Sequence, residues 1–143
     1  MNLIRLVADM LHLAAICILI YRIHKTRNCI GISCKTQELF LITFCVRYFD
    51  LFLYYISLYN TCMKIFFICT SVYIIYLMRF KRPYCITYDK VADEFPHFLV
   101  ILPAALGLTC LVNSGWEPWE FMWSYSLWLE SLAFVPQIIM LTK

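Results

Sequence analysis

The sequence alternates between long apolar blocks and short segments that hold most of its charged residues. A helix needs roughly 20 mainly apolar residues to cross the hydrocarbon layer of a bilayer. Five blocks approach this length, and they cover residues 3–21, 39–58, 63–78, 98–112 and 119–141. We therefore predict an all-α fold, a multi-pass transmembrane bundle of about five helices, with residues 1–143 forming one transmembrane domain.

The composition favours lipid over water as the surroundings of this chain. Hydrophobic residues make up 63% of the sequence and charged residues 15%, and the mean hydropathy is +0.75. A soluble protein with buried apolar helices is the alternative, but such helices would leave no polar face to cover a globule. The first block contains Arg5, Asp9 and His12, so we interpret it as a retained helix and not as a cleaved signal peptide.

The basic residues predict how the chain is oriented, because lysine and arginine concentrate on the cytosolic side of membrane proteins. The connections after the first and third blocks are rich in them, whereas residues 57–61 and 113–118 contain none. We therefore predict a lumenal N-terminus and a cytosolic C-terminus. The basic residues of the two cytosolic connections are Arg22, Lys25, Arg27, Lys35, Arg79, Lys81, Arg82 and Lys90.

Other functional classes find little support in the sequence. Five of the eight cysteines fall in or beside apolar blocks, where they act as small hydrophobes, and we predict no disulfide bonds. Cys29 and Cys34 flank a basic loop without nearby histidine ligands, which makes a poor zinc site. The sequence has no phosphate-binding glycine loop, nucleophile elbow or HExxH motif, and its basic residues follow a topology pattern. We predict a non-enzyme with no cofactor, no metal and no nucleic-acid partner.

Several ionisable residues lie inside the predicted helices, mainly in their lumenal halves. Arg5, Asp9 and His12 are spaced four and three residues apart, which places them on one face of the first helix. Each charge at membrane depth costs roughly 2.5–3.5 kcal/mol to insert, so it usually faces a polar partner or an aqueous cavity. The second and fifth blocks contribute further polar or aromatic candidates, namely Arg47, Tyr48, Asp50, Glu120, Trp123 and Glu130.

Two interpretations of these charges remain open. In the first, they neutralise one another, Arg5 with Asp9 and Arg47 with Asp50, while neighbouring helices hydrogen-bond Glu130. In the second, they face one cavity that binds a ligand with both signs of charge, especially a peptide with a free terminal carboxylate. An imidazole has an ordinary pKa of about 6.5, so His12 suits a response to organelle pH, although a passive hydrogen-bonded histidine fits equally well.

Five segments spread over nearly the whole chain match a known family. They are MNLIRLVADMLHLAA at the start, GISCKTQELF at 31–40, VRYFDLF at 46–52, YISLYNTCMK at 55–64 and WSYSLWLESLAFVPQ at 123–137. With them the chain resembles the KDEL receptors, also called ER lumen protein-retaining receptors, although residues 81–93 fit less well. The resemblance implies a seven-helix fold related to SWEET and PQ-loop transporters, with two three-helix repeats, a linking helix and a PQ element at Pro136 and Gln137.

The resemblance implies a receptor that binds the C-terminal Lys/His-Asp-Glu-Leu retention signal of ER-resident proteins in the acidic Golgi. It also implies retrograde vesicle transport of this cargo and its release at the neutral pH of the ER. The expected location is the membranes of the endoplasmic reticulum, the Golgi and transport vesicles. The implied partners are the signal peptide, membrane lipid and the vesicle coat machinery, which the family recruits through a lysine-rich cytosolic tail.

The resemblance also implies a role for each candidate residue. Arg47, helped by Tyr48, would bind the terminal carboxylate of the signal, and Arg5 would bind its glutamate. Asp50 with Glu120 would bind the basic first residue, and Trp123 would line the same pocket. His12 would be the pH-sensing residue. Glu130 would act with it in gating, because it matches a buried glutamate that is hydrogen-bonded to a tyrosine of a later helix.

Members of the family continue through two more helices beyond the position that matches Lys143. We therefore expect this chain to lack those helices, which supply another cargo-binding arginine and the coat-recruiting tail. Two other functions stay open. One is a PQ-loop-like transporter of a small amino acid or sugar, and the other is an inactive truncated product.

Overall fold

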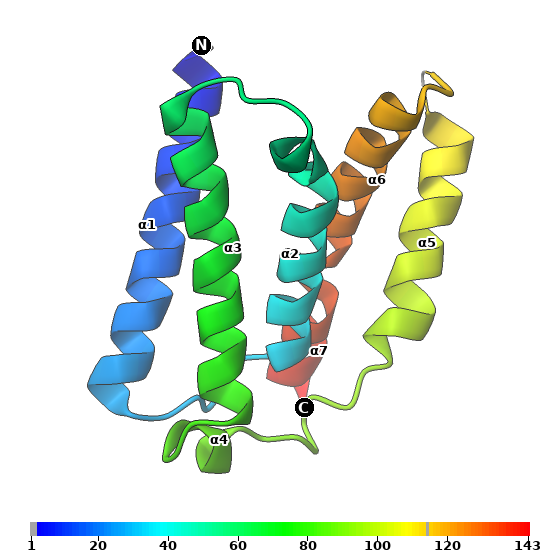
Figure 1. Ribbon diagram of the computed structural model, residues 1–143. Helices are drawn as coiled ribbons and strands as arrows, with labels where there is room; N and C mark the ends of the chain where they lie inside the picture. The colour runs from blue at the N-terminus through cyan, green and yellow to red at the C-terminus, as the bar shows by residue number, and fades with distance from the viewer. Residues whose placement is uncertain (1–2, 114) are drawn as a thin grey trace.

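The computed structural model describes residues 3–113 and 115–143, and the regular elements of this part are all helical (Figure 1). Three segments are long and apolar enough to cross a membrane, namely α1, α3 and the unit formed by α6 and α7. The predicted all-α, multi-pass fold is confirmed. In chain order the elements are α1 (Leu3–Thr26), α2 (Cys34–Arg47), the 3-10 turn η1 (Phe49–Phe52), α3 (Leu58–Arg79), α4 (Tyr84–Thr87), α5 (His97–Val112), α6 (Pro118–Leu132) and α7 (Val135–Thr142).

The helices α2 and α5 are shorter than α1, α3 and the unit formed by α6 and α7. They contain 14 and 16 residues, which corresponds to about 21 and 24 Å at 1.5 Å per residue. A hydrocarbon layer is roughly 30 Å thick. Complete crossing by these two helices therefore stays a prediction.

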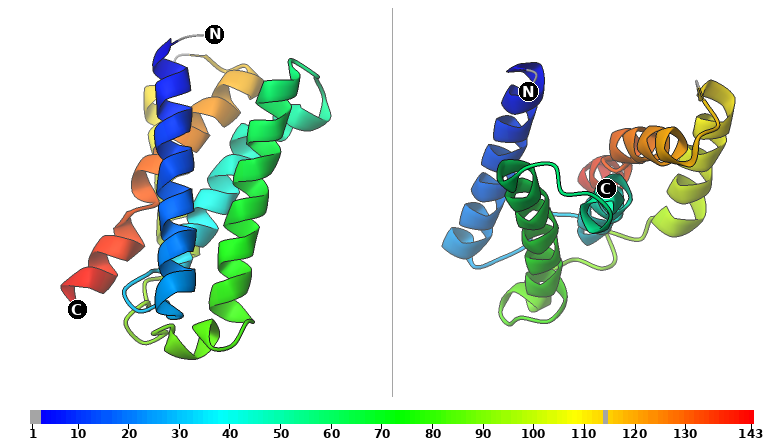
Figure 2. Two further views of the ribbon diagram at one scale, coloured as in Figure 1. Left: turned by 90° about the vertical axis from the view of Figure 1, so that its left-hand side faces the viewer. Right: turned by 45° about the horizontal axis from the view of Figure 1, so that its top comes forward.

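The helix α2 lies in the middle of the bundle, with α1 and α3 on one side and α5 and α6 on the other (Figures 1 and 2). Phe44 belongs to one hydrophobic core, which joins α2 to α1 and α3. Leu39 belongs to a second core, which joins α2 to α5 and α6. These two residues are about 140° apart around the helix. Their spacing lets one helix support both cores, and it fixes α2 as the element against which the charged residues are arranged.

The connections alternate between the two ends of the bundle. The N-terminus and η1 lie at one end, and α4 and the C-terminus lie at the other (Figure 1). The basic connections after α1 and α3 both lie at the end that holds the C-terminus. This grouping is what the charge pattern requires, and the assignment of that end to the cytosol stays a prediction.

The second predicted helix, over residues 39–58, is wrong at both ends. The hydroxyl of Ser33 accepts a hydrogen bond from the Thr36 amide at 3.2 Å and caps the start of α2. The hydroxyl of Ser57 caps α3 in the same way, through the Asn60 amide at 3.2 Å. Between these helices the chain forms η1 and an extended stretch. This stretch is as apolar as the helix before it, so hydropathy alone could not separate them.

The fifth predicted helix, over residues 119–141, is two helices. Pro136 has no amide hydrogen, and its ring would clash with the carbonyl four residues earlier, that of Leu132. The helix α6 accordingly ends at Leu132, and α7 starts at Val135 with the proline in its first turn, where proline is tolerated. The first and third helices are also longer than predicted, because their polar ends remain helical.

The side chain of Gln137 ties α7 to the start of α2. Its Oε1 accepts a hydrogen bond from the Ser33 amide at 2.8 Å, and its Nε2 donates to the Gly31 carbonyl at 2.8 Å. The Gln137 amide donates to the hydroxyl of Thr36 at 3.1 Å. The proline therefore breaks the helix, and the glutamine next to it holds the resulting segment in place.

The carboxylate of Asp93 fastens the connection before α5 to the same point. Asp93 is 2% exposed, and it accepts hydrogen bonds from the Ser33 hydroxyl at 2.8 Å, the Tyr88 hydroxyl at 2.6 Å and the Lys35 amide at 3.3 Å. Burial of Tyr88, together with its hydrogen bond to Asp93, raises the pKa of the phenol. The connection around Asp93 thus has a structural function that its weak family resemblance does not indicate.

Candidate functional site

Arg47, at the C-terminal end of α2, forms an ion pair with Glu130 of α6. Its Nη2 lies 2.5 Å from Oε2 of Glu130, and its Nε donates to the hydroxyl of Ser126 at 3.2 Å. A guanidinium has five N–H groups, so these two contacts leave three of them for other acceptors. The expected pairing of Arg47 with Asp50 is wrong, because the end of α2 directs the arginine toward α6. The expectation that neighbouring helices hydrogen-bond Glu130 is met by Arg47.

Asp50 forms its ion pair with Lys64 of α3. The Lys64 ammonium lies 2.7 Å from both carboxylate oxygens of Asp50. The lysine side chain is 7% exposed and the aspartate side chain is 25% exposed. The same ammonium lies 5.5 Å from the centre of the Tyr48 ring, which adds a cation–π contact. Burial of an ammonium is tolerated only with such partners, so the pair is required in this arrangement.

A cavity of about 520 Å³ brings most of the predicted site residues together, and for that reason it is here called the main cavity, although a neighbouring cavity is larger, at about 600 Å³. The volume of the main cavity falls within the roughly 300–1,000 Å³ that ligand pockets occupy. The charged groups around it are three cations and two carboxylates, contributed by α1, α3 and the end of α2 with η1. The main cavity is lined by Arg5, Ala8, Asp9, Arg47, Tyr48, Asp50, Ile56, Lys64, Trp123 and Leu127.

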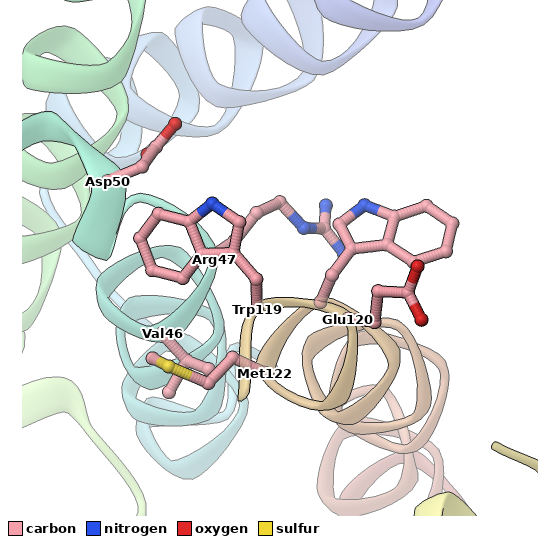
Figure 3. A pocket seen from close by; sticks show the side chains of 7 residues that line it. Val46, Arg47, Asp50, Trp119, Glu120 and Met122 are labelled. Carbon is pink, nitrogen blue, oxygen red and sulfur yellow. The ribbon is translucent and has the colours of Figure 1, made fainter. Parts of the chain in front are cut away.

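A second pocket of about 270 Å³, here called the indole pocket, adjoins the main cavity. The two share Arg47, Asp50 and Trp123. Figure 3 shows Arg47 extending from α2 toward α6, from which Trp119 and Glu120 project. Glu120 is exposed and lines the indole pocket but not the main cavity. Asp50 lines both compartments and Glu120 lines only the indole pocket, so a ligand group that contacts both carboxylates would occupy the indole pocket.

His12 lies apart from the main cavity, in an aromatic environment. Its ring makes edge contacts with Phe44 and Phe67, with centroid distances of 5.2 and 5.3 Å. Gln37 and Ser71 line the same small pocket. His12 lines neither the main cavity nor the indole pocket, so any influence of its ring on a ligand would be indirect.

The structure thus separates the predicted residues into three groups. Arg5, Arg47, Tyr48, Asp50 and Trp123 line the main cavity, Glu120 lines the adjoining pocket, and His12 and Glu130 line neither. Arg5 and Asp9 share the cavity, and no ion pair joins them among the described residues. Arg47 pairs with Glu130 and Asp50 pairs with Lys64, so mutual neutralisation occurs for these residues with partners other than the predicted ones. Ligand binding by the residues that share the cavity stays a prediction.

Sequence reasoning did not select two residues that the site contains. Lys64 lies within the apolar third block, and an isolated cation there could have been identified by the rule that membrane charges are functional or paired. Ser126 gave no such signal, because a serine inside a membrane helix often bonds only its own backbone. It does so here, to the Trp123 carbonyl at 2.7 Å, while also accepting from Arg47.

An ion-paired site of this kind suits recognition of a charged ligand. Guanidinium groups bind carboxylates through two parallel hydrogen bonds, and both arginines line the main cavity. The carboxylates of Asp50 and Glu120, which line the indole pocket, offer acceptors for a cationic group. A multi-pass helical bundle with such a cavity is typical of a membrane receptor or transporter for a polar ligand.

Comparison with known proteins identifies the family. A family model described as ER lumen protein retaining receptor matches residues 28–143. The chain is 47% identical to the ER lumen protein-retaining receptor of Plasmodium falciparum, and the match covers the whole chain and 65% of that protein. It is 41% identical to the receptor of Petunia hybrida and 48% identical to receptor 2 of Bos taurus, over the whole chain and 66% of each relative. The chain belongs to the ER lumen protein retaining receptor family.

Proposed function

We propose that the chain binds the C-terminal Lys/His-Asp-Glu-Leu signal of lumenal proteins, as a receptor and not as an enzyme. The chain spans 65–66% of the length of the curated relatives it matches, and those relatives are named for the retention of lumenal proteins. The observation that carries the proposal is the gathering of Arg5, Arg47 and Asp50 around one cavity inside a membrane bundle.

The proposed binding mode follows the charges of the cavity. Arg47, which retains free N–H groups, would bind the terminal carboxylate with help from the hydroxyl of Tyr48. Arg5 would bind the glutamate of the signal. Asp50 and Glu120 would bind the basic first residue, with Trp123 between the two compartments as an apolar wall. The pairing of opposite charges offsets the desolvation of each group.

The proposal extends to transport. The N-terminal end of the bundle would face the lumen, where the cavity can meet cargo, and the basic end would face the cytosol. The chain would capture cargo in the acidic Golgi, return it in retrograde vesicles through the vesicle coat machinery, and release it in the ER. It would accordingly reside in the ER membrane, the Golgi membrane and transport vesicles.

A peptide with a free C-terminus is expected to bind, and the same peptide with an amidated C-terminus is expected to bind at least about 30-fold more weakly. Amidation removes the negative charge that the arginines would pair, and loss of one partner of a desolvated charge pair costs roughly 2–5 kcal/mol. Calorimetric titration of the full chain in lipid nanodiscs at about pH 5.5 and at neutral pH measures both affinities. Equal affinity for the two peptides would contradict the proposal, and substrate flux in proteoliposomes would then favour a transporter.

Replacement of His12 by alanine is expected to flatten the pH dependence of peptide binding. If the loaded state takes up a proton at His12, affinity rises as the pH falls, and removal of the imidazole removes that rise. His12 would act indirectly, because it lines neither the main cavity nor the indole pocket. The measurement is the ratio of affinities at about pH 5.5 and neutral pH.

His24→Ala is the matched control for this prediction. His24 lies near the opposite end of α1, where its ring is hydrogen-bonded to the hydroxyls of Tyr73 and Tyr84. Its loss removes another imidazole without touching the cavity, so the pH profile should keep its shape. A folded His12→Ala protein with an unchanged affinity ratio would remove His12 from the mechanism.

A further inference from the structure

The ion pair between Lys64 and Asp50 occupies the carboxylate that a basic ligand residue would need. Both oxygens of Asp50 lie 2.7 Å from the Lys64 ammonium. Asp50 lines both the main cavity and the indole pocket, whereas Lys64 lines only the main cavity. Lys64 thus engages both oxygens of a carboxylate that also borders the pocket containing Glu120.

We propose that Lys64 is an exchangeable counter-cation for Asp50. Only a positively charged first residue of the ligand would displace the Lys64 ammonium from this carboxylate. The inference rests on the proposed function. A neutral first residue would leave the Lys64–Asp50 pair intact and gain nothing at Asp50. A cationic residue would take the place of the ammonium. Lys64 touches no ligand atom in this scheme and acts through Asp50, so it is a positioning residue that sets specificity.

The chemistry of the lysine side chain permits this exchange. An ammonium on a flexible four-carbon stem can rotate away from one acceptor, whereas a guanidinium held in a two-contact geometry moves less readily. Lys64 is almost fully buried, so it needs another acceptor once it is released. Asp9 lines the same cavity and offers such an acceptor.

The exchange predicts that Lys64 lowers the affinity of basic ligands. If a ligand can bind only while an internal ion pair is broken, its apparent affinity equals its intrinsic affinity multiplied by the fraction of molecules in which the pair is broken. Arg47 differs in this respect, because it keeps N–H groups in reserve while paired with Glu130. The anionic end of the ligand would therefore bind without displacing a protein group, and only its basic end would have to displace Lys64 from Asp50.

The test compares two N-acetylated peptides with free C-terminal carboxylates, Lys-Asp-Glu-Leu and Gln-Asp-Glu-Leu, so that only the lysine side chain makes the first residue cationic. Both are titrated against the full chain in lipid nanodiscs at about pH 5.5. The first peptide begins with lysine and not with histidine, because the lysine ammonium is fully charged at this pH. For Lys64→Gln we expect affinity for the lysine peptide to rise by about 3- to 10-fold, and affinity for the glutamine peptide to change less than about twofold.

Lys64→Arg keeps the buried ion pair and should change the affinity for the lysine peptide in the opposite direction. A guanidinium holds a carboxylate through two hydrogen bonds, so this variant should bind the lysine peptide several-fold more weakly while keeping its affinity for the glutamine peptide. In the double variant Lys64→Gln with Asp50→Asn, the gain in affinity for the lysine peptide should disappear, because the carboxylate that Lys64 occupies is gone and only Glu120 still distinguishes the two peptides.

The outcomes separate this inference from the function on which it rests. If the unaltered chain binds neither peptide, the proposed function fails and the inference fails with it. If the unaltered chain binds both peptides but Lys64→Gln weakens them equally, Lys64 has only a structural role. If Lys64→Gln weakens the lysine peptide selectively, Lys64 supports the binding of the basic residue, and exchange is overturned.

Discussion

Replacement of Arg47 by alanine is expected to weaken binding of a free-carboxylate retention peptide by about 30- to 700-fold, which corresponds to roughly 2–4 kcal/mol. The guanidinium is the group best placed to bind the terminal carboxylate, because it lines both the main cavity and the indole pocket. Titration of the purified chain with labelled peptide measures the loss. Arg22→Ala is the control, since Arg22 is exposed near the opposite end of α1.

The pairing of Arg47 with Glu130 makes a second variant necessary. Arg47→Ala leaves the carboxylate of Glu130 without its partner at 2.5 Å, and an unpaired carboxylate at membrane depth destabilises the fold. The double variant Arg47→Ala with Glu130→Gln removes both charges, so it should regain stability but not peptide binding. Recovery of binding in the double variant would mean that Arg47 serves the fold and not the ligand.

Replacement of Asp93 by alanine is expected to destabilise the protein by roughly 3–5 kcal/mol, and to lower its Tm by about 10–15 °C. The change leaves the hydroxyls of Ser33 and Tyr88 and the amide of Lys35 without their shared acceptor in a buried position. Hydrogen bonds to a charged acceptor contribute more than neutral ones. Thermal unfolding of the detergent-purified protein, followed by tryptophan fluorescence, measures the effect.

Glu94→Ala is the matched control, because it removes a carboxylate from the adjacent position. The Glu94 side chain is 79% exposed, and its only ion pair in the described part of the chain is a 3.9 Å contact with Lys143. Its loss should leave the Tm nearly unchanged, as expected for an exposed pair. Asp93 lines neither the main cavity nor the indole pocket, so any folded Asp93→Ala protein should keep its peptide affinity. Equal Tm values for the two variants would contradict a structural role for Asp93.

Helix boundaries illustrate where reasoning from hydropathy reached its limit. The fourth predicted helix, over 98–112, matches α5 to within one residue, because polar and proline-containing segments flank it. The second was misplaced, because a 3-10 turn lies inside continuous apolar sequence. The fifth has outer bounds within one residue of those predicted, but a proline divides it into two helices. Capping by Ser33 and Ser57 sets the starts of α2 and α3 through single hydrogen bonds, and a window average over apolar residues does not detect them.

The candidate site shows the same division between local and long-range information. The sequence selected Arg5, Arg47 and Asp50 as unusual residues, because the cost of inserting a charge applies to each position by itself. It did not predict their partners. Arg47 pairs with a residue 83 positions away, and Lys64 reaches Asp50 from a different helix.

The sequence by itself determined that this chain is a membrane protein of several helices, and which positions carry charge within them. Both properties follow from the transfer of individual side chains between water and lipid, which depends little on their neighbours. The tertiary structure decided that Arg47 faces Glu130, that Lys64 holds Asp50, and that His12 lies among phenyl rings outside the cavity. These outcomes depend on how three helices pack around α2, and no local pattern in the sequence specifies that packing.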